Sequence, residues 1–135
     1  MKNMKIEAIV KEQMEILEKF GRESDEFSTW YKKHTDGARK VISAYVGSKD
    51  LGFDEIVFNS DDLIWEKEVP EVIEFCQEAK IGWFVYGSGY SRAMEVIMAL
   101  TEAGAKVGKF VVKEYTDTRW GEENVVKVPG IRINL

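Results

Sequence analysis

Hydrophobic residues recur every three or four positions in the first third of the chain. Over residues 4–20 this spacing, with Glu and Lys between the apolar positions, predicts one amphipathic helix. The same spacing over residues 27–45 predicts a second, long helix, in which Gly37 is a weak point because glycine disfavours a helix interior. Gly21 separates the two patterns. We therefore expect residues 1–48 to form a helical hairpin.

The hydrophobic period changes after this segment. Short apolar runs rich in Val, Ile and aromatic residues now alternate with helical patterns, and the last two runs are joined by a polar loop. The predicted elements are a strand at residues 53–58, a helix at 69–79, a strand at 82–86, a helix at 91–103 and two strands at 107–115 and 124–134.

This order predicts an α/β fold, on the borderline with α+β. Strand-helix-strand units require parallel pairing with right-handed crossovers, so we expect the first three strands to be mostly parallel. The fourth is expected to be antiparallel at an edge of a four-stranded mixed sheet, with helices packed on the sheet. Pro129 inside this strand predicts a bulge or an edge position, because proline cannot donate to a central ladder. We expect residues 1–135 to form a single domain, with the α/β core at 53–135.

Composition limits the chemistry that the chain can carry. A hydrophobic fraction of 44% in 135 residues is too high for a disordered chain. The single cysteine, Cys76, and single histidine, His34, exclude an intrachain disulfide and a metal site built from several His or Cys ligands. No apolar run approaches the roughly 18 residues of a membrane span or resembles a signal peptide. We expect a cytoplasmic protein with no cofactor, no metal and no membrane contact.

The net charge of −5 is concentrated in the middle of the chain. Residues 51–80 contain nine acidic side chains against Lys67 and Lys80, whereas the remainder is slightly basic. An acidic segment repels phosphates at long range, so direct binding of nucleic acid is disfavoured. The same charges are also typical of a solvated helix face.

A strand-to-helix turn at residues 87–92 is the first candidate site. Backbone amides at a helix N-terminus, the hydroxyls of Ser88 and Ser91 and the charge of Arg92 suit a phosphate or a nucleotide. The turn lacks the lysine of a Walker A loop and the third glycine of the dinucleotide fingerprint. Ser88 or Ser91 acting as a helix cap is therefore the competing interpretation. The candidate ligand-binding residues are Gly87, Ser88, Gly89, Tyr90, Ser91 and Arg92.

No catalytic residue is assigned from the sequence. Ser88 is not followed by a histidine that would act as its base, and His34 lies upstream on an aromatic helix face. Cys76 lies on an apolar helix face, which predicts a buried and inert thiol. Carboxylates are frequent near residues 54–68, but clustering along the chain does not establish the geometry of a metal or glycosidase site.

Large aromatic residues provide a second candidate site. Trp65 and Trp120 fall in predicted loops or element ends, where exposed aromatic side chains often anchor a protein partner. Packing within the core or a loop is the competing interpretation. A protein partner or a second copy of the chain would bind there.

Three features of the sequence stand together over about residues 53–135: residues 63–69, the strand-to-helix passage at 82–91 and the closing hairpin that ends at 131–135. In these features the chain resembles a family of small proteins from bacterial conjugative elements and prophages. The resemblance implies a mobile genetic element as the setting and implies no functional residues.

Two functions follow from these observations. The first is a non-enzymatic accessory or protein-interaction domain, indicated by the missing catalytic motifs and the loop aromatics. The alternative is a domain that binds a small ligand, a nucleotide or a phosphate at residues 87–92.

Overall fold

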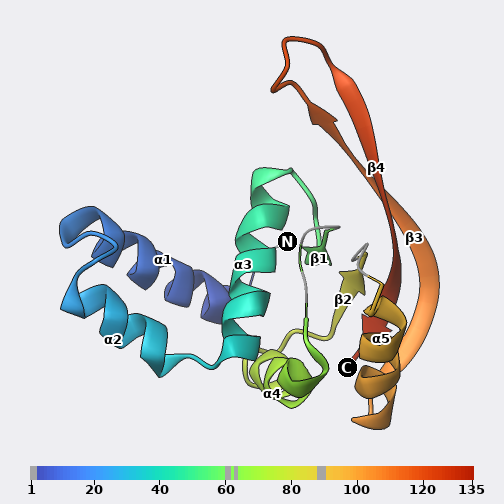
Figure 1. The fold of residues 1–135 in the computed structure, drawn as a ribbon, viewed down its shortest axis with the longest axis horizontal. Coiled ribbons are helices and arrows are strands. Elements are labelled where there is room, and N and C mark those ends of the chain that lie inside the picture. Colours follow the sequence, from blue (N-terminus) through green and yellow to red (C-terminus); the bar gives the residue numbers. More distant parts are fainter. Residues whose placement is uncertain (1–2, 60–61, 63, 88–90) are drawn as a thin grey trace.

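The fold is a four-stranded mixed sheet packed against helices, with two further helices that project from the body (Figure 1). The computed structural model describes residues 3–59, 62, 64–87 and 91–135. Among these, we find no helix whose length and hydrophobicity would let it cross a lipid bilayer. The elements in chain order are α1 (Met4–Lys19), α2 (Asp25–Lys33), α3 (Asp36–Asp50), β1 (Val57–Phe58), the 3-10 turn η1 (Glu66–Glu68), α4 (Val69–Glu78), β2 (Trp83–Tyr86), α5 (Ala93–Glu102), β3 (Lys106–Asp117) and β4 (Asn124–Asn134).

Helix α1 is attached to the rest of the molecule at its first turn. The side-chain oxygen of Asn3 accepts hydrogen bonds from the amides of Lys5 at 3.2 Å and Ile6 at 3.1 Å, which caps the helix. The side-chain nitrogen of Asn3 donates to the carbonyl of Ala79 after α4, at 2.8 Å. From this point α1 and α2 extend away from the sheet (Figure 1).

The prediction of a single helix over residues 27–45 is wrong, because the chain forms two helices there, α2 and α3. His34 and Thr35 are extended between the two helices, and the hydroxyl of Thr35 accepts from an amide in the first turn of α3 at 3.1 Å. Gly37 lies in the first turn of α3, just after this break. A Cβ at Gly37 would lie 2.5 Å from the Cβ of Glu71, so the glycine lets α3 approach α4 closely.

The strands lie in the order β1-β2-β4-β3. β1 and β2 are parallel, and β4 is antiparallel to both β2 and β3, so the first three strands run in one direction as expected. The expected antiparallel hairpin does form one edge of the sheet, but its outer strand is β3. The expected edge position of the fourth strand itself is wrong, because β4 lies between β2 and β3. Ile133 is fully buried opposite Phe84, which is what a central strand requires.

Pro129 lies where β4 has passed the end of β2. The β2–β4 ladder reaches only from Asn134 to Ile131, so at Pro129 the ladder partner is β3 alone. Proline is therefore accommodated on the side that lacks a neighbouring strand. The irregularity in register lies in β3, between Val107 and Phe110, and not at Pro129.

The first strand is shorter than the expected residues 53–58, because only Val57 and Phe58 pair with β2. The preceding residues are held by their side chains. Phe53 packs against a small apolar cluster, and Glu55 enters an ion-pair cluster described below.

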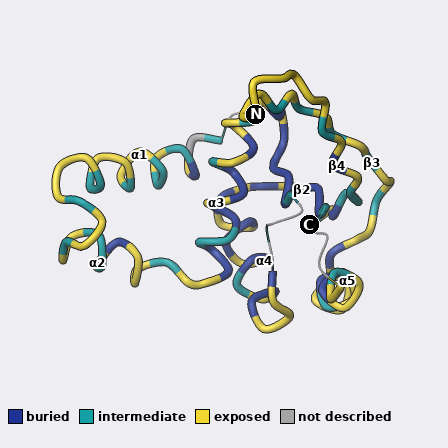
Figure 2. The backbone as a smooth tube through the Cα atoms, turned by 45° about the horizontal axis from the view of Figure 1, so that its top comes forward, coloured by how far each residue is buried: buried dark blue, intermediate teal, exposed yellow. Residues whose placement is uncertain are grey.

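Buried side chains form two clusters on opposite faces of the sheet, because alternate strand residues point to opposite sides. Figure 2 shows the buried positions along the backbone. The larger cluster joins the helices to Phe58, Phe84 and Ile133. The smaller one has four buried members: Phe53, Val57, Val85 and Val128.

The close approach of α3 and α4 gives a test by substitution. We expect Gly37→Ala to lower the free energy of unfolding by about 1–3 kcal/mol, because the new Cβ overlaps Glu71 and the backbone of α4. Gly47→Ala in the same helix is the control, since no atom lies within 4 Å of its Cβ and alanine favours a helix. Urea unfolding of both variants would contradict this assignment if Gly37→Ala were as stable as Gly47→Ala.

Candidate functional site

Strands β3 and β4 form a two-stranded ribbon that extends beyond the rest of the sheet (Figure 1). Their pairing continues out to Asp117 and Asn124, far past the end of β2. The exposed fractions of three apolar side chains on the ribbon are 83% for Phe110, 57% for Val112 and 64% for Val125. The connection at its tip carries Trp120, which is 82% exposed.

The two faces of the ribbon differ because alternate residues point in opposite directions. On the inner face, Tyr115 meets the ring of Phe53 at 6.1 Å, and Val111 packs on the smaller apolar cluster. We use "outer face" for the opposite side, which the cross-strand pairs define. From base to tip these pairs are Phe110–Ile131, Val112–Pro129, Glu114–Lys127 and Thr116–Val125.

Glu55 anchors the ribbon to the body of the protein. Its carboxylate accepts a hydrogen bond from the indole of Trp83 in β2 at 2.8 Å. The ammonium of Lys113 in β3 lies 2.8 Å from Oε1, and the guanidinium of Arg132 in β4 lies 3.2 Å from Oε2. Lys113 also reaches Asp54 at 3.1 Å. One carboxylate of which only 8% is exposed thus contacts three strands.

These contacts keep the groups ionised. Burial by itself raises the pKa of Glu55, but Lys113, Trp83 and Arg132 outweigh it, so this pKa lies below its ordinary value of 4.5. The contact with Glu55 likewise raises the pKa of Lys113. The hydrogen bond from Lys113 lowers the pKa of Asp54. The cluster is therefore a set of fixed charges at neutral pH.

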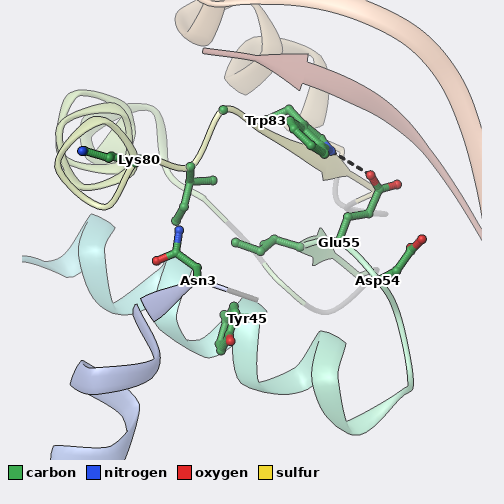
Figure 3. A pocket seen from close by; sticks show the side chains of 9 residues that line it. Asn3, Tyr45, Asp54, Glu55, Lys80 and Trp83 are labelled. Atoms are coloured by element: carbon green, nitrogen blue, oxygen red, sulfur yellow. Dashed lines mark hydrogen bonds between the residues drawn. The ribbon is translucent and has the colours of Figure 1, made fainter. Parts of the chain in front are cut away.

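A cavity of about 180 Å³ lies beside Glu55 (Figure 3). Several of its polar side chains are already bonded within the protein: the hydroxyl of Tyr45 donates to Glu7 at 2.9 Å, and the indole of Trp83 donates to Glu55 (Figure 3). Burial, with the bond to Glu7, raises the pKa of Tyr45 to about 12, so the phenol remains a hydrogen-bond donor. We assign no reaction to this cavity.

The candidate turn at residues 87–92 is described only in part, since Ser88, Gly89 and Tyr90 lie outside the described residues. A Cβ at Gly87 would lie 2.9 Å from the carbonyl of Pro129 and 3.1 Å from that of Phe58, so packing accounts for this glycine. Ser91 is exposed two residues before α5, and Arg92 forms an ion pair with Glu66. No side-chain hydrogen bond caps α5 at Arg92.

The structure brings Trp65 and Arg92 together. Both line one open pocket with Glu66 and Lys67, and Trp65 is 44% exposed. Trp120 does not line this pocket and lies at the tip of the ribbon instead. The sequence grouped Trp65 with Trp120 by residue type, whereas the fold places Trp65 beside the candidate turn.

His34 and Cys76 lie in packed surroundings. The ring of His34 lies 4.9 Å from that of Trp30, and burial lowers its pKa. Burial raises the pKa of the Cys76 thiol to about 12, which makes it a poor nucleophile. Within residues 3–59, 62, 64–87 and 91–135, no group of three or more His, Cys, Asp or Glu residues is placed to hold a metal ion.

Comparison with known proteins identifies the family of the chain. The family model of a domain of unknown function, DUF7698, matches residues 40–135. The chain belongs to this family. The DUF7698 match begins inside α3 and contains the whole sheet, the Glu55 cluster and the ribbon, whereas α1 and α2 precede it. Searches among curated proteins and among solved structures found no match.

The Glu55 cluster of the DUF7698 domain predicts a pH-dependent stability. We expect Glu55→Gln to lower the free energy of unfolding by about 2 kcal/mol at neutral pH, because charged hydrogen bonds to a buried group are lost. The pKa of Glu55 is lower in the folded chain than its ordinary value of 4.5. Its contribution is therefore complete above pH 4.5 and is lost as the pH falls through the folded-state pKa. Denaturant unfolding across this pH range should show that the free energies of unfolding of the wild type and of the variant become equal in acid.

The control for this prediction is Glu114→Gln, which removes an exposed ion pair with Lys127 at 3.9 Å. Exposed pairs contribute at most about 1 kcal/mol, so little change is expected. A difference between Glu55→Gln and wild type that stays constant down to about pH 3 would show that the carboxylate charge is not responsible.

Proposed function

We propose that this chain is a protein-interaction domain whose contact surface is the outer face and tip of the β3–β4 ribbon. The observation that carries the proposal is the exposure of Phe110, Val112, Val125 and Trp120 on one projecting element. Several exposed apolar side chains on one element are typical of a surface that another molecule covers, although here the charged pair Glu114–Lys127 lies between Val112 and Val125. A two-stranded ribbon gains little stability alone, so a partner that covers it would also stabilise it.

The Glu55 cluster supports this function because it holds the base of the ribbon in a fixed position. Lys113 and Arg132 come from the two ribbon strands, and both meet the same buried carboxylate. A prepositioned surface loses less conformational freedom when it binds. Trp120 at the tip is the residue type most often found as an energetic anchor of protein interfaces.

The wider setting of this proposal is an expectation from the composition and from what the resemblance implies. We expect a non-enzymatic accessory protein that acts in the cytoplasm, in the context of a conjugative element or prophage. We also expect no direct contact with nucleic acid, because residues 51–80 are strongly acidic.

The proposal is tested with Trp120→Ala. Because Trp120 is 82% exposed, we expect the variant and the wild type to have the same melting temperature. We expect binding at the ribbon to weaken at least about tenfold. Sedimentation velocity measures self-association, and a pull-down followed by titration of the identified protein measures another partner. Met14→Ala is the control, since Met14 is 59% exposed on α1 and away from the ribbon. Equal binding by wild type, Trp120→Ala and Phe110→Ala would overturn the ribbon as the contact surface.

The second candidate is an anion-binding site at Trp65 and Arg92, favoured by the open pocket that they share. The pocket follows the ends of the parallel strands β1 and β2, a common position for ligands in α/β folds. Glu66 already neutralises Arg92, so a ligand anion must compete with this carboxylate.

This competition supplies the test of the second candidate. Thermal-shift titrations with inorganic phosphate and nucleotides should show a larger shift for Glu66→Gln than for wild type, because Arg92 is released from its ion pair. Arg92→Gln should show none. Absence of a shift in Glu66→Gln would remove the site from consideration.

A further inference from the structure

We propose that the groove between α3 and the arm formed by α1 and α2 binds a small organic anion with an apolar body. The arm meets α3 at an angle (Figure 1), and residues from all three helices line the groove. The inference goes beyond the proposed function, because no ribbon residue lines this groove. It is carried by three observations: the charge left at the groove, a buried indole without an acceptor and a glycine that packing does not explain.

The groove is a suitable size for a small ligand. Its volume is about 420 Å³. Ligand sites are often found between helices, with volumes of roughly 300–1,000 Å³. The apolar part of its lining consists of Phe27 and Trp30 from α2 and Ile42 and Val46 from α3. The rings of Phe27 and Trp30 are stacked with their centres 5.8 Å apart. The groove therefore offers a continuous apolar surface to the body of a ligand.

Arg39 holds α2 and α3 together at one side of the groove. Its guanidinium lies 3.7 Å from the centre of the Tyr31 ring and donates to the carbonyl of Tyr31 at 2.6 Å. It also bonds to the carbonyl of His34 and forms an ion pair with Asp36. The charge of Arg39 is therefore balanced within the protein. The shape of the groove is also fixed before a ligand binds, which lowers the cost of binding.

The charge that remains is the positive charge of Arg22 in the turn between α1 and α2. Its guanidinium lies 6.0 Å from the centre of the Phe27 ring, and no ion pair joins it to another described residue. Among the described lining residues, the one carboxylate is Asp50, which ends α3 on the body of the molecule. The α1–α2 turn is at the outer end of the arm (Figure 1). An anion that pairs with Arg22 therefore lies away from Asp50.

The indole of Trp30 lacks a hydrogen-bond acceptor. Trp30 is 3% exposed, and its Nε1 has no partner among the described residues. A buried donor without an acceptor destabilises the protein, and a bond to a ligand oxygen would recover this loss. Because the nitrogen is covered, the indole must shift for its N–H to reach an acceptor in the groove. This donor favours a ligand that carries oxygen atoms over a pure hydrocarbon.

Gly47 leaves open space over α3 at the groove. Glycine disfavours a helix interior, yet no atom lies within 4 Å of the position of a Cβ at Gly47. Packing within the chain therefore requires glycine at Gly37 but not at Gly47. Glycine lets another molecule approach the backbone closely, and Gly47 lines the groove. The apolar body of the ligand is expected to lie over Gly47, beside Val46.

Fluorescence titration with 8-anilinonaphthalene-1-sulfonate tests the site. This dye is an aromatic monoanion that reports binding to apolar surface. We expect saturable binding of one molecule at the groove of the wild type. Gly47→Leu fills the space over α3 and should weaken this binding at least about tenfold. Phe110→Ala is the control, because the exposed ring of the ribbon is the other apolar surface that would attract the dye.

The charge is tested separately. Arg22→Gln should weaken binding of the sulfonate dye up to about fivefold, the usual effect of an exposed ion pair. Binding of N-phenyl-1-naphthylamine, the same molecule without the sulfonate, should not change. Lys19→Gln is the matched control, since Lys19 ends α1 near the same turn but does not line the groove. Circular dichroism and urea unfolding confirm that each variant is folded.

The outcomes separate the groove from the ribbon. Weaker binding to Gly47→Leu with unchanged binding to Phe110→Ala supports the groove. Equal binding by wild type and a folded Gly47→Leu overturns it, and so does a wild type that shows no saturable binding. Equal loss of the charged and neutral dyes in Arg22→Gln overturns the assignment to an anion. None of these results alters the proposed function, which is measured by partner binding to Trp120→Ala.

Discussion

The arrangement of the sheet depends on one buried carboxylate. Glu55 contacts Trp83, Lys113 and Arg132, which come from β2, β3 and β4. Burying a carboxylate is costly unless cations and hydrogen bonds replace the lost water, and here two cations and an indole do so. The segment before β1 therefore contacts the ribbon through the side chains of Phe53, Asp54 and Glu55, although only the two residues of β1 that follow it pair in the sheet. The ribbon gains a fixed base, and its outer face is left without a covering helix beyond α5.

The molecule combines a family domain with a separate helical arm. The DUF7698 match starts at residue 40, within α3, so α1 and α2 lie outside it. The arm is fastened at a few points: Ile6 is fully buried, Lys5 donates to the carbonyl of Glu78 at 2.8 Å, and Glu7 accepts from Tyr45. Most of α1 is half-buried or exposed (Figure 2). The arm and the ribbon therefore project from the same body as two separate elements.

The type of most elements was predicted correctly, because the spacing of hydrophobic residues depends on local structure. The predictions were wrong where contacts between residues distant in sequence determine the structure. Gly37 looked like a weak point inside one helix, but the chain breaks at His34 and Thr35, and Gly37 lies in the first turn of α3, where it contacts α4. The central position of β4 depends on its second ladder with β2, which no local pattern reveals. Glu55 and Arg132 are 77 positions apart in the sequence, so residue spacing gave no signal for the cluster. Ser88, Gly89 and Tyr90 lie outside the described residues, and their assignment remains a prediction.

The central position of β4 has a consequence for the order of folding. β4 follows every other strand of the sheet in sequence, yet it pairs with both β2 and β3. Until it is in place, β3 has no neighbour and β2 has only the two residues of β1. During synthesis the helices of the first half can form and pack before β4 has been made, whereas the sheet stays incomplete until then. Contacts so distant in sequence slow folding, because the loop must close before they stabilise anything. The sheet is therefore completed only when β4 pairs, so the ribbon and the part of the core that lies on the sheet form together.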